Sequence, residues 1–519
     1  MALVRLLRSS RGALPLLSTL RRESSAASML EAATRLAQEF PGDFTLQYPP
    51  RREFFKEFFS TSNGPSFAHQ VVSDPLTHLT SDYHKQIMLY FHVPFCEHKC
   101  SYCNFAVDIR NNRYLHEEYV DHLIAGAGHF REFLLRSNPD QISIPGIDIG
   151  GGTPTLLEAA TLTRFLNALR PLRDSCTRPR PLSIETTPAI ASSHLERLYA
   201  LKEGGVDRIS MGLQSTNDGL LGSLNRGKEA SLSVRAVENI QRVGFDRFSV
   251  DIIFGLPGQI MELWQSDLQR IVDLGIDTVT TYDCLYRGKG RSMTKSVVRP
   301  SSETYGQFYD YAFEFLTSHG FNAQYGSVNF TKHKGETGTS AYFEGRLLDG
   351  LQFFGIGNYA TSTFGDKWWF APHGVDQWMD LVTTHKEGGD DWTRAARYLP
   401  LGDCYTLPIE ERAAKYLLLS LSFGIIDPVR YQYIFQEDIH QRFSFALSFA
   451  VEAGWMRFEA SSGKYVIEKG HFKDMPQLRS LFYSSKAIHW LKNVSEHPVD
   501  QFRHRILQKL RDKRESTFL

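Results

Sequence analysis

Short apolar runs alternate with longer amphipathic stretches from residue 86 onward. Runs that are apolar at nearly every position indicate strands buried on both faces, and the stretches between them repeat with a helical period. We expect strands at Ile87–Val93, Gly146–Gly150, Leu182–Glu185, Arg208–Leu213, Phe248–Gly255 and Thr278–Leu285. We expect helices at Leu157–Leu172, His194–Glu203, Ser233–Val243 and Trp264–Leu274. Six strand–helix units predict an α/β fold with a parallel sheet, closed or partly closed into a barrel.

A second domain is predicted from near Leu399. Pro408 precedes an apolar helix, Glu410–Ser422, and proline is favoured in a first helical turn. A helix at Phe443–Glu452 and a hairpin of Trp455–Glu459 with Tyr465–Glu468 follow. Helices followed by a hairpin are typical of a winged-helix-like domain. Because no basic recognition helix is evident, we expect a packing or partner module that does not read DNA.

Composition narrows the classes of partner. The chain has 519 residues, with 58 Lys and Arg against 58 Asp and Glu. This balance gives no reason to expect nucleic acid or an anionic membrane as the main partner. No apolar run reaches the roughly 20 residues that span a bilayer, so no transmembrane segment is expected. The basic tail, Arg503–Arg514, fits a solvated terminal helix better than a lipid-binding one.

The first 28 residues carry five arginines among Leu, Ala and Ser, and no acidic residue precedes Glu23. Such a segment is typical of a mitochondrial transit peptide, and a disordered tail is the alternative. Three scattered cysteines, Cys176, Cys284 and Cys404, show no disulfide framework, which agrees with a reducing compartment. We therefore expect the protein in the mitochondrial matrix.

The strongest chemical signal is the spacing Cys96-x3-Cys100-x2-Cys103, directly after the first expected strand. Thiolates gathered this closely suit a soft metal centre, and three of them indicate an iron–sulfur cluster with one iron left open to a ligand. The alternatives are a zinc loop with a distant fourth ligand, or chance spacing. Three glycines, Gly150 to Gly152, follow the second strand, where the backbone can approach a ligand and donate N–H bonds.

These segments together resemble the radical S-adenosylmethionine (SAM) superfamily, in particular its coproporphyrinogen dehydrogenase-like branch. The resemblance is strong from Ile87 to Trp369. It lies in the cysteine spacing with Tyr102 and in the segments His92–Cys96, Gly150–Pro154, Arg208–Gln214, Asn225–Arg226 and Asp251–Gln259. It implies a partial (β/α)6 radical SAM barrel, followed by the small helical, winged-helix-like domain.

The resemblance also implies the cofactors. Cys96, Cys100 and Cys103 would hold a [4Fe-4S] cluster whose fourth iron binds SAM. The reduced cluster would cleave SAM to a 5′-deoxyadenosyl radical, which abstracts hydrogen from a substrate. The positions that match SAM-contacting residues of the family are Tyr90, Tyr102, Gly151, Gly152, Thr153, Glu185, Gln214, Arg226 and Asp251.

One residue separates the two groups of this branch. The dehydrogenases carry a fourth cysteine two positions after the last one of the motif, whereas the haem chaperones carry phenylalanine, as here at Phe105. The arm that precedes the barrel in the dehydrogenases is not obvious in Met29–Lys85. The chain is thus most similar to the haem chaperones. This implies haem or another tetrapyrrole, an electron donor and haem-accepting proteins as partners.

The haem-associated segment departs from the chaperone pattern. Chaperones generally show His-Asn-x-x-Tyr-Trp, whereas this chain reads Thr339-Ser-Ala-Tyr-Phe343, so His333 is the first alternative haem ligand to consider. Two other functions stay open. One is a radical enzyme that decarboxylates coproporphyrinogen oxidatively, or that methylates or opens a haem ring. The other is a catalytically idle binding protein, against which the intact cysteines argue.

The expected organisation is a transit peptide, an N-terminal extension, the radical SAM barrel, a family-specific β-rich extension and the C-terminal domain with its basic tail. The boundaries are residues 1–28, 29–85, 86–320, 321–398 and 399–519, respectively.

Overall fold

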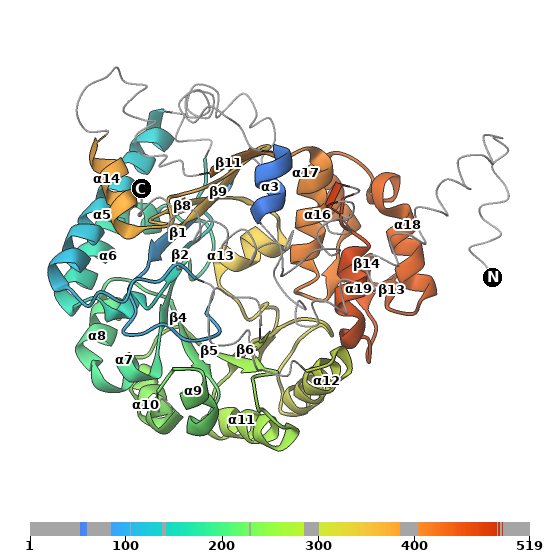
Figure 1. Cartoon of the computed structure of the whole chain (residues 1–519), viewed down its shortest axis with the longest axis horizontal. Coiled ribbons are helices and arrows are strands. Elements are labelled where there is room, and N and C mark those ends of the chain that lie inside the picture. The colour runs from blue at the N-terminus through green and yellow to red at the C-terminus, as the bar shows by residue number, and fades with distance from the viewer. Residues whose placement is uncertain are drawn as a thin grey trace, which may run out of the picture.

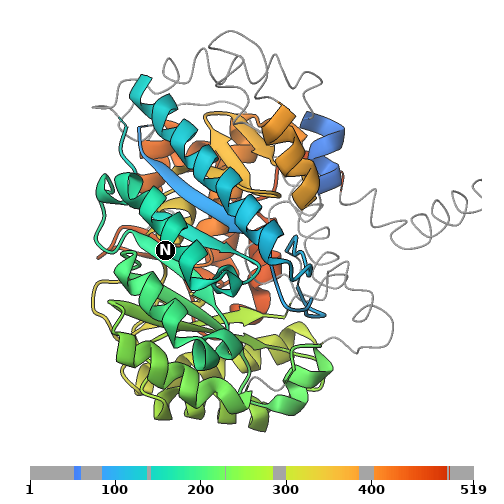
Figure 2. The same cartoon turned by 90° about the vertical axis from the view of Figure 1, so that its left-hand side faces the viewer.

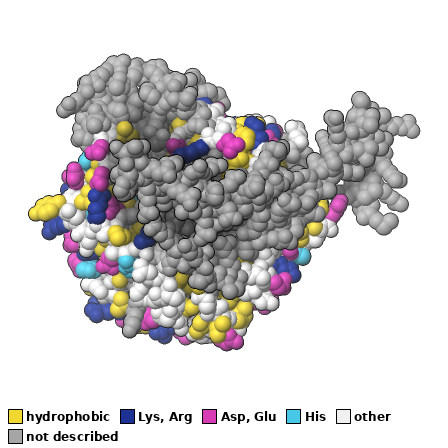
Figure 3. Space-filling view, viewed as in Figure 1, with side chains coloured by type: hydrophobic (Ala, Val, Ile, Leu, Met, Phe, Trp, Pro, Cys, Tyr) yellow, Lys and Arg dark blue, Asp and Glu magenta, His cyan; other side chains and the backbone are white. Residues whose placement is uncertain are grey.

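The computed structural model describes residues 52–59, 85–103, 105–136, 142–227, 230–284, 300–384, 403–484, 486–487 and 490. The predicted transit peptide, most of the N-terminal extension and the basic tail lie outside these residues. A curved sheet forms one arc of the molecule, with helices along its outer side (Figures 1 and 2). In the view of Figure 3, the described basic and acidic side chains lie interspersed around the rim.

Six parallel strands form the centre of the sheet, as the apolar pattern predicted. They pair in chain order, β1 with β2 through to β5 with β6, which is the order that consecutive βαβ units produce. Their bounds are β1 Ile87–Val93, β2 Ile147–Gly151, β3 Leu182–Thr186, β4 Arg208–Gln214, β5 Arg247–Phe254 and β6 Thr278–Asp283. The partial-barrel fold class is therefore confirmed.

The helices between these strands cover the outer face of the arc (Figure 1). Apolar side chains at every second strand position, such as Ile149, Ile209 and Val250, belong to the buried core together with these helices. The helices are α5 Arg113–Arg136, α6 Ala159–Asp174, α7 Pro188–Ser193, α8 Leu195–Glu203, α9 Asp218–Ser223, α10 Ser233–Val243 and α11 Met261–Asp273, and α12 Ser302–Ser318 follows β6.

The inner face of the strands is polar, although the sequence suggested strands that are apolar on both faces. The alternate positions on neighbouring strands carry Ser183, Arg208 and Ser249, whose side chains are hydrogen-bonded across the sheet. Ser210 likewise donates to Asp251. Apolar and polar positions do alternate along these strands, but the polar residues are mostly small and stand between large apolar ones. The strands therefore read as apolar throughout in the sequence.

The sheet continues beyond the six strands on both sides. At one edge β7 pairs antiparallel with β6, and at the other edge β8 runs parallel to β1 and is followed by an antiparallel meander. The added elements are β7 Asn329–Thr331, α13 Ala341–Phe343, a π-helix at Glu344–Leu348, β8 Gln352–Ile356, β9 Thr361–Phe364, β10 Lys367–Phe370, α14 Val375–Thr384 and β11 Asp403–Thr406. The short N-terminal helix α3, Arg52–Phe59, packs against β11.

The C-terminal domain consists of helices around a small three-stranded sheet of order β12-β14-β13. We propose that it begins at α16 and not near Leu399, because β11 belongs to the main sheet. Its elements are α16 Ile409–Ser420, β12 Ile425–Ile426, α17 Pro428–Phe435, α18 Ile439–Glu452, β13 Met456–Glu459, β14 Lys464–Ile467, a 3-10 turn at Phe472–Asp474 and α19 Met475–Ser480. Within the described residues, no helix is both long and apolar enough to cross a membrane.

Candidate metal centre

The three cysteines of the motif lie in a loop at the carboxyl end of β1. Backbone hydrogen bonds close the base of this loop, since the Cys96 N–H donates to the Asp108 carbonyl and the Asp108 N–H donates to Pro94. At the far side the Cys103 N–H donates to the Cys100 carbonyl at 3.2 Å. Cys100 is buried and Cys96 and Cys103 are half-buried. The loop therefore gathers three thiols at the edge where a parallel barrel carries its chemistry.

Arg226 and His98 lower the pKa of the Cys100 thiol. Burial acts to raise its pKa, but a hydrogen bond from His98 and the charge of Arg226 together lower it below the ordinary value. Arg226 Nη1 lies 3.7 Å from Cys100 Sγ. Burial raises the pKa of Cys96 to about 12 and also raises that of Cys103. Cys100 is thus the thiol most ready to lose its proton to a metal.

Arg226 connects the cysteine loop with β4. Its Nη1 donates to the Tyr102 hydroxyl at 2.8 Å, and its Nη2 donates to the Gly212 carbonyl. Next to it, the Asn225 side-chain amide donates to the Lys99 carbonyl at 3.0 Å. Gln214 ends β4 with a φ of 67°, a left-handed conformation that is uncommon outside glycine and is enriched at functional sites.

The glycine motif lets β2 pack tightly against the cysteine loop. A Cβ on Gly151 would lie 2.6 Å from the His92 ring, and one on Gly152 would lie 2.6 Å from the Pro94 backbone. The N–H groups of Gly152 and Thr153 donate to Val93 and Phe95, and Gly151 donates to Glu185 at 3.3 Å. The protein itself satisfies the N–H groups of Gly151, Gly152 and Thr153, and contact of this backbone with a ligand stays a prediction. Gly150 and Gly151 also lie within β2 and not after it.

Three carboxyl groups line the lumen below the cysteine loop: Asp148, Glu185 and Asp251. Burial, followed by the charges of the two aspartates, raises the pKa of Glu185 to about 8. Burial also raises the pKa of Asp148 to about 7 and that of Asp251 above its usual range. A cationic group placed here would favour the ionised carboxylates. Asp251 lies in the middle of β5 and Glu185 one residue before the end of β3, so neither strictly ends its strand.

Tyr90 and His92 complete the inner face of β1. His92 Nε2 lies 3.2 Å from the Ala106 carbonyl, and its Nδ1 lies 3.2 Å from the Tyr90 hydroxyl. Because a carbonyl only accepts, Nε2 carries the proton and Nδ1 accepts from Tyr90. Burial lowers the pKa of His92 to about 4, which keeps the ring neutral. Both nitrogens are engaged, so His92 supports the loop and is not available as a metal ligand.

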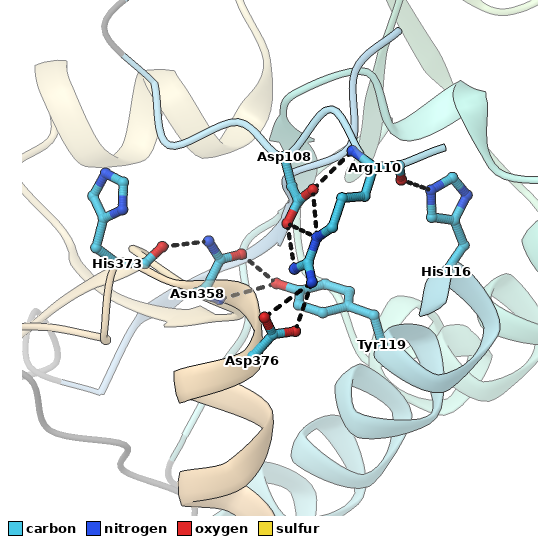
Figure 4. Close-up of polar contacts among 7 residues, drawn as sticks. All are labelled: Asp108, Arg110, His116, Tyr119, Asn358, His373 and Asp376. Atoms are coloured by element: carbon cyan, nitrogen blue, oxygen red, sulfur yellow. Dashed lines mark hydrogen bonds and ion pairs between the residues drawn. The ribbon is translucent and has the colours of Figure 1, made fainter. Parts of the chain in front are cut away.

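A polar clamp ties the cysteine loop to the rest of the protein (Figure 4). Arg110 pairs with Asp108 on the loop and, through Nη1, with Asp376 on α14 at 2.9 Å. Beside it the Tyr119 hydroxyl, on α5, donates to Asn358 at 2.8 Å. The clamp therefore joins three segments that are distant in sequence.

The donor set of the loop consists of three thiols, the ligand type that holds iron–sulfur clusters. Cys96 Sγ lies 3.6 Å from the Thr153 hydroxyl, which adds a polar neighbour to the thiol set.

The structure brings all twelve predicted site residues to one end and the lumen of the barrel. Sequence reasoning missed His98, Asp148, Arg208 and Arg110. Asp148 and Arg208 belong to expected strands, and a charged residue in an otherwise apolar strand is the signal that could have identified them.

His333 does not lie with this group. It follows β7 and pairs with Asp277 at 3.0 Å, and Asp277 directly precedes β6, at the amino end of the strands. The cysteine loop stands at the opposite end. His333 and the cysteine loop thus lie at opposite ends of the strands, and haem ligation by His333 stays a prediction. In the neighbouring segment Ser340 donates to Asp148 at 2.7 Å and caps α13.

The fold and the thiol loop define a class, namely barrels that present three cysteines at the carboxyl end of the first strand. Residues 90–271 match the Radical SAM superfamily. The chain is 30% identical to the heme chaperone HemW of Lactococcus lactis over 52% of this chain and 68% of that protein. It is 28% identical to radical S-adenosyl methionine domain-containing protein 1, mitochondrial, of Danio rerio, over 64% of this chain and 70% of that protein.

A solved structure agrees on the fold. The coproporphyrinogen III oxidase HemN of Escherichia coli superposes with a TM-score of 0.64 at 19% identity, covering 82% of this chain and 95% of that one. The chain therefore belongs to the heme chaperone HemW family of the Radical SAM superfamily. The superfamily implies a [4Fe-4S] cluster and SAM.

Proposed function

We propose that the protein is a SAM- and cluster-binding haem chaperone of mitochondria. The observation that carries the proposal is Phe105, which lies in the cysteine loop and is 57% exposed. It offers an apolar surface beside the cluster position and no thiol. Relatives named as haem chaperones, and a relative named as mitochondrial, support the ligand and the compartment. The arginine-rich Met1–Ser28 supports the same compartment.

The residues around the thiols have separate roles in this proposal. Cys96, Cys100 and Cys103 hold the cluster. Tyr90, Glu185, Gln214, Arg226 and Asp251 contact SAM, and Tyr102, Gly151, Gly152 and Thr153 shape its site. The cluster and SAM, when bound, supply one-electron chemistry. Because Glu185 and Asp251 are buried, their carboxylates attract a cationic ligand strongly. Haem reaches its acceptor by transfer to another protein, and an electron donor reduces the cluster.

The experiment is anaerobic reconstitution with iron, sulfide and SAM, followed by parallel titration with haem and incubation with coproporphyrinogen. We expect stable haem absorbance, slow or no SAM cleavage, and no protoporphyrinogen. A variant with Cys96, Cys100 and Cys103 all replaced by Ala should contain no cluster, and retention of full iron and sulfide there would remove the assignment. Release of carbon dioxide in step with SAM consumption would instead identify an oxidative decarboxylase.

A further inference from the structure

A second site lies away from the cysteine loop, in a cleft between the main sheet and the C-terminal domain. Its free space, including the part open to solvent, is about 710 Å³. Phe353 and Thr363 line one side, and Tyr416, Leu419, Ile434 and Phe435 line the other. In Figure 1, α16 and α17 stand beside α13 at this position. We call this space the cationic cleft because Arg346, Lys367, Arg412 and Lys415 border it.

Two of these cations, Arg346 and Lys415, face aromatic rings and no carboxylate. Arg346 Cζ lies 4.4 Å from the centre of the Phe353 ring, and Lys415 Nζ lies 5.7 Å from the same ring and 3.9 Å from the Trp368 ring. Among the described residues neither forms an ion pair, and the buried Arg346 Nε has no hydrogen-bond partner. In the described part of the chain, no carboxylate therefore pairs with either side chain.

The neighbouring carboxylates are already paired. Asp366 lines the cleft but forms an ion pair with Lys367 at 3.3 Å. Asp349, close in sequence, pairs with Arg178 and Arg430. Burial, and next the charge of Arg346, lower the pKa of Lys415 well below its ordinary value. Burial and Arg346 thus disfavour the charged form of Lys415 in the empty cleft, and an anion bound between the two side chains would favour that form.

A single side chain, Tyr342, joins the cleft to the predicted SAM site, because it contacts both Arg346 and Tyr90. Arg346 Nη1 lies 3.5 Å from the Tyr342 hydroxyl, and the Tyr342 ring stacks on Tyr90 with centres 5.6 Å apart. Arg346 is carried by the π-helix Glu344–Leu348, a rare conformation that is frequent at functional sites.

We propose that the cationic cleft binds the carboxylate groups of an apolar organic anion, the chemical class that includes propionate-bearing tetrapyrroles. Arg346 and Lys415 bind the carboxylates, and the aromatic and aliphatic walls take the apolar body. The choice of a tetrapyrrole as this anion rests on the proposed function, whereas the preference for an apolar carboxylate rests on the cleft alone.

The test uses the full chain with Lys415→Met and Arg346→Met, singly and together. Lys469→Met is the matched control, because Lys469 also lies over an aromatic ring, Phe313 at 5.3 Å, but outside the cleft. The probes are haem, haem dimethyl ester, dodecanoate and inorganic phosphate. We expect haem to bind about 10-fold more weakly to each single variant and about 100-fold more weakly to the double variant. The control should bind haem as the unmodified chain does, and the ester should bind all variants equally.

Thermal unfolding separates binding from a structural role. Because Met removes an uncompensated charge from the cleft, Lys415→Met without ligand should unfold at the same or a higher temperature. A large fall in melting temperature, or unchanged haem and dodecanoate affinities in the double variant, would overturn the cleft proposal. Phosphate that binds more tightly than dodecanoate would overturn the apolar part of it. If the chain binds dodecanoate through Lys415 but does not bind haem, the cleft proposal is supported and the proposed haem function is contradicted.

Discussion

Asp148 stands in the barrel lumen with a single hydrogen-bond partner. Its Oδ2 accepts from Ser340, and its Oδ1 is buried with no partner in the described structure. Because burial raises its pKa to about 7, the folded protein keeps this proton in a pH range where the unfolded chain, with an aspartate pKa of about 3.9, has lost it. The folded state therefore binds more protons between these two values, and its stability falls as pH rises through them.

Replacing Asp148 with Asn removes this pH dependence. Relative to the unmodified chain, Asp148→Asn should become progressively more stable from about pH 4 to pH 7, by on the order of 4 kcal/mol in total, and then remain level. Denaturant unfolding at a series of pH values measures this difference. The control is Asp273→Asn, on the exposed side of α11. A stability difference that does not change with pH would show that Asp148 ionises normally.

Arg226 offers a second test at this scale. Its contacts with Tyr102 and Gly212 hold the guanidinium beside the predicted SAM position. Loss of a hydrogen bond to a charged group costs about 1.5–3 kcal/mol, so Arg226→Gln should weaken SAM binding about 10- to 100-fold. The cluster content should be unchanged because the three thiols remain. Calorimetry with SAM measures the affinity, and the control is Arg242→Gln, at an exposed position of α10. Equal SAM affinities in the two variants would mean that SAM binds elsewhere.

At the scale of elements, the cysteine loop depends on a clamp that no local pattern specifies. Arg110 and Asp376 are both well exposed, so their ion pair contributes little to global stability, about 1 kcal/mol or less. Its effect is to hold the loop against α14. Arg110→Ala should therefore leave the melting temperature nearly unchanged but should accelerate loss of the cluster to a chelator.

The matched control is Arg113→Ala, which removes an ion pair with Glu117 within α5, near the same loop but not across it. Absorbance decay under chelator compares the two variants. Equal rates in Arg110→Ala and Arg113→Ala would show that the loop is held by its backbone hydrogen bonds alone.

The sequence predicted the central elements well because their signals are local. All six parallel strands appear within two residues of their expected bounds, and helix Ser233–Val243 has the bounds that were expected. The outer strands were not placed, since β7 has three residues and β9 four, too few for a periodic pattern. The three cysteines were predicted from their spacing and the nine SAM positions from motif resemblance. Asp148 and Arg110 instead depend on partners, Ser340 and Asp376, that are far away in sequence.

For the whole molecule, the barrel and the C-terminal domain share one core. Phe472 stacks on Tyr309 of α12 with ring centres 3.7 Å apart, and both side chains are fully or almost fully buried. Phe472→Ala should cost about 3–5 kcal/mol and lower the temperature of one common unfolding transition. Calorimetry measures it, with the half-exposed Phe458→Ala on β13 as control. Two separate transitions in the unmodified chain would contradict a shared core.

The hydrogen bonds at the base of the cysteine loop affect how the protein recovers after it loses its cluster. Its backbone bonds from Cys96 to Asp108 and from Asp108 to Pro94 involve no thiol, and Arg226 braces the loop from the other side. The bonds that close the loop therefore do not depend on a metal, and we expect the protein to fold without its cluster, unlike domains that fold only around their metal. A protein that loses its cluster to oxygen would keep its shape and remain a receptor for a new cluster, so damage could be reversed by reloading and without new synthesis.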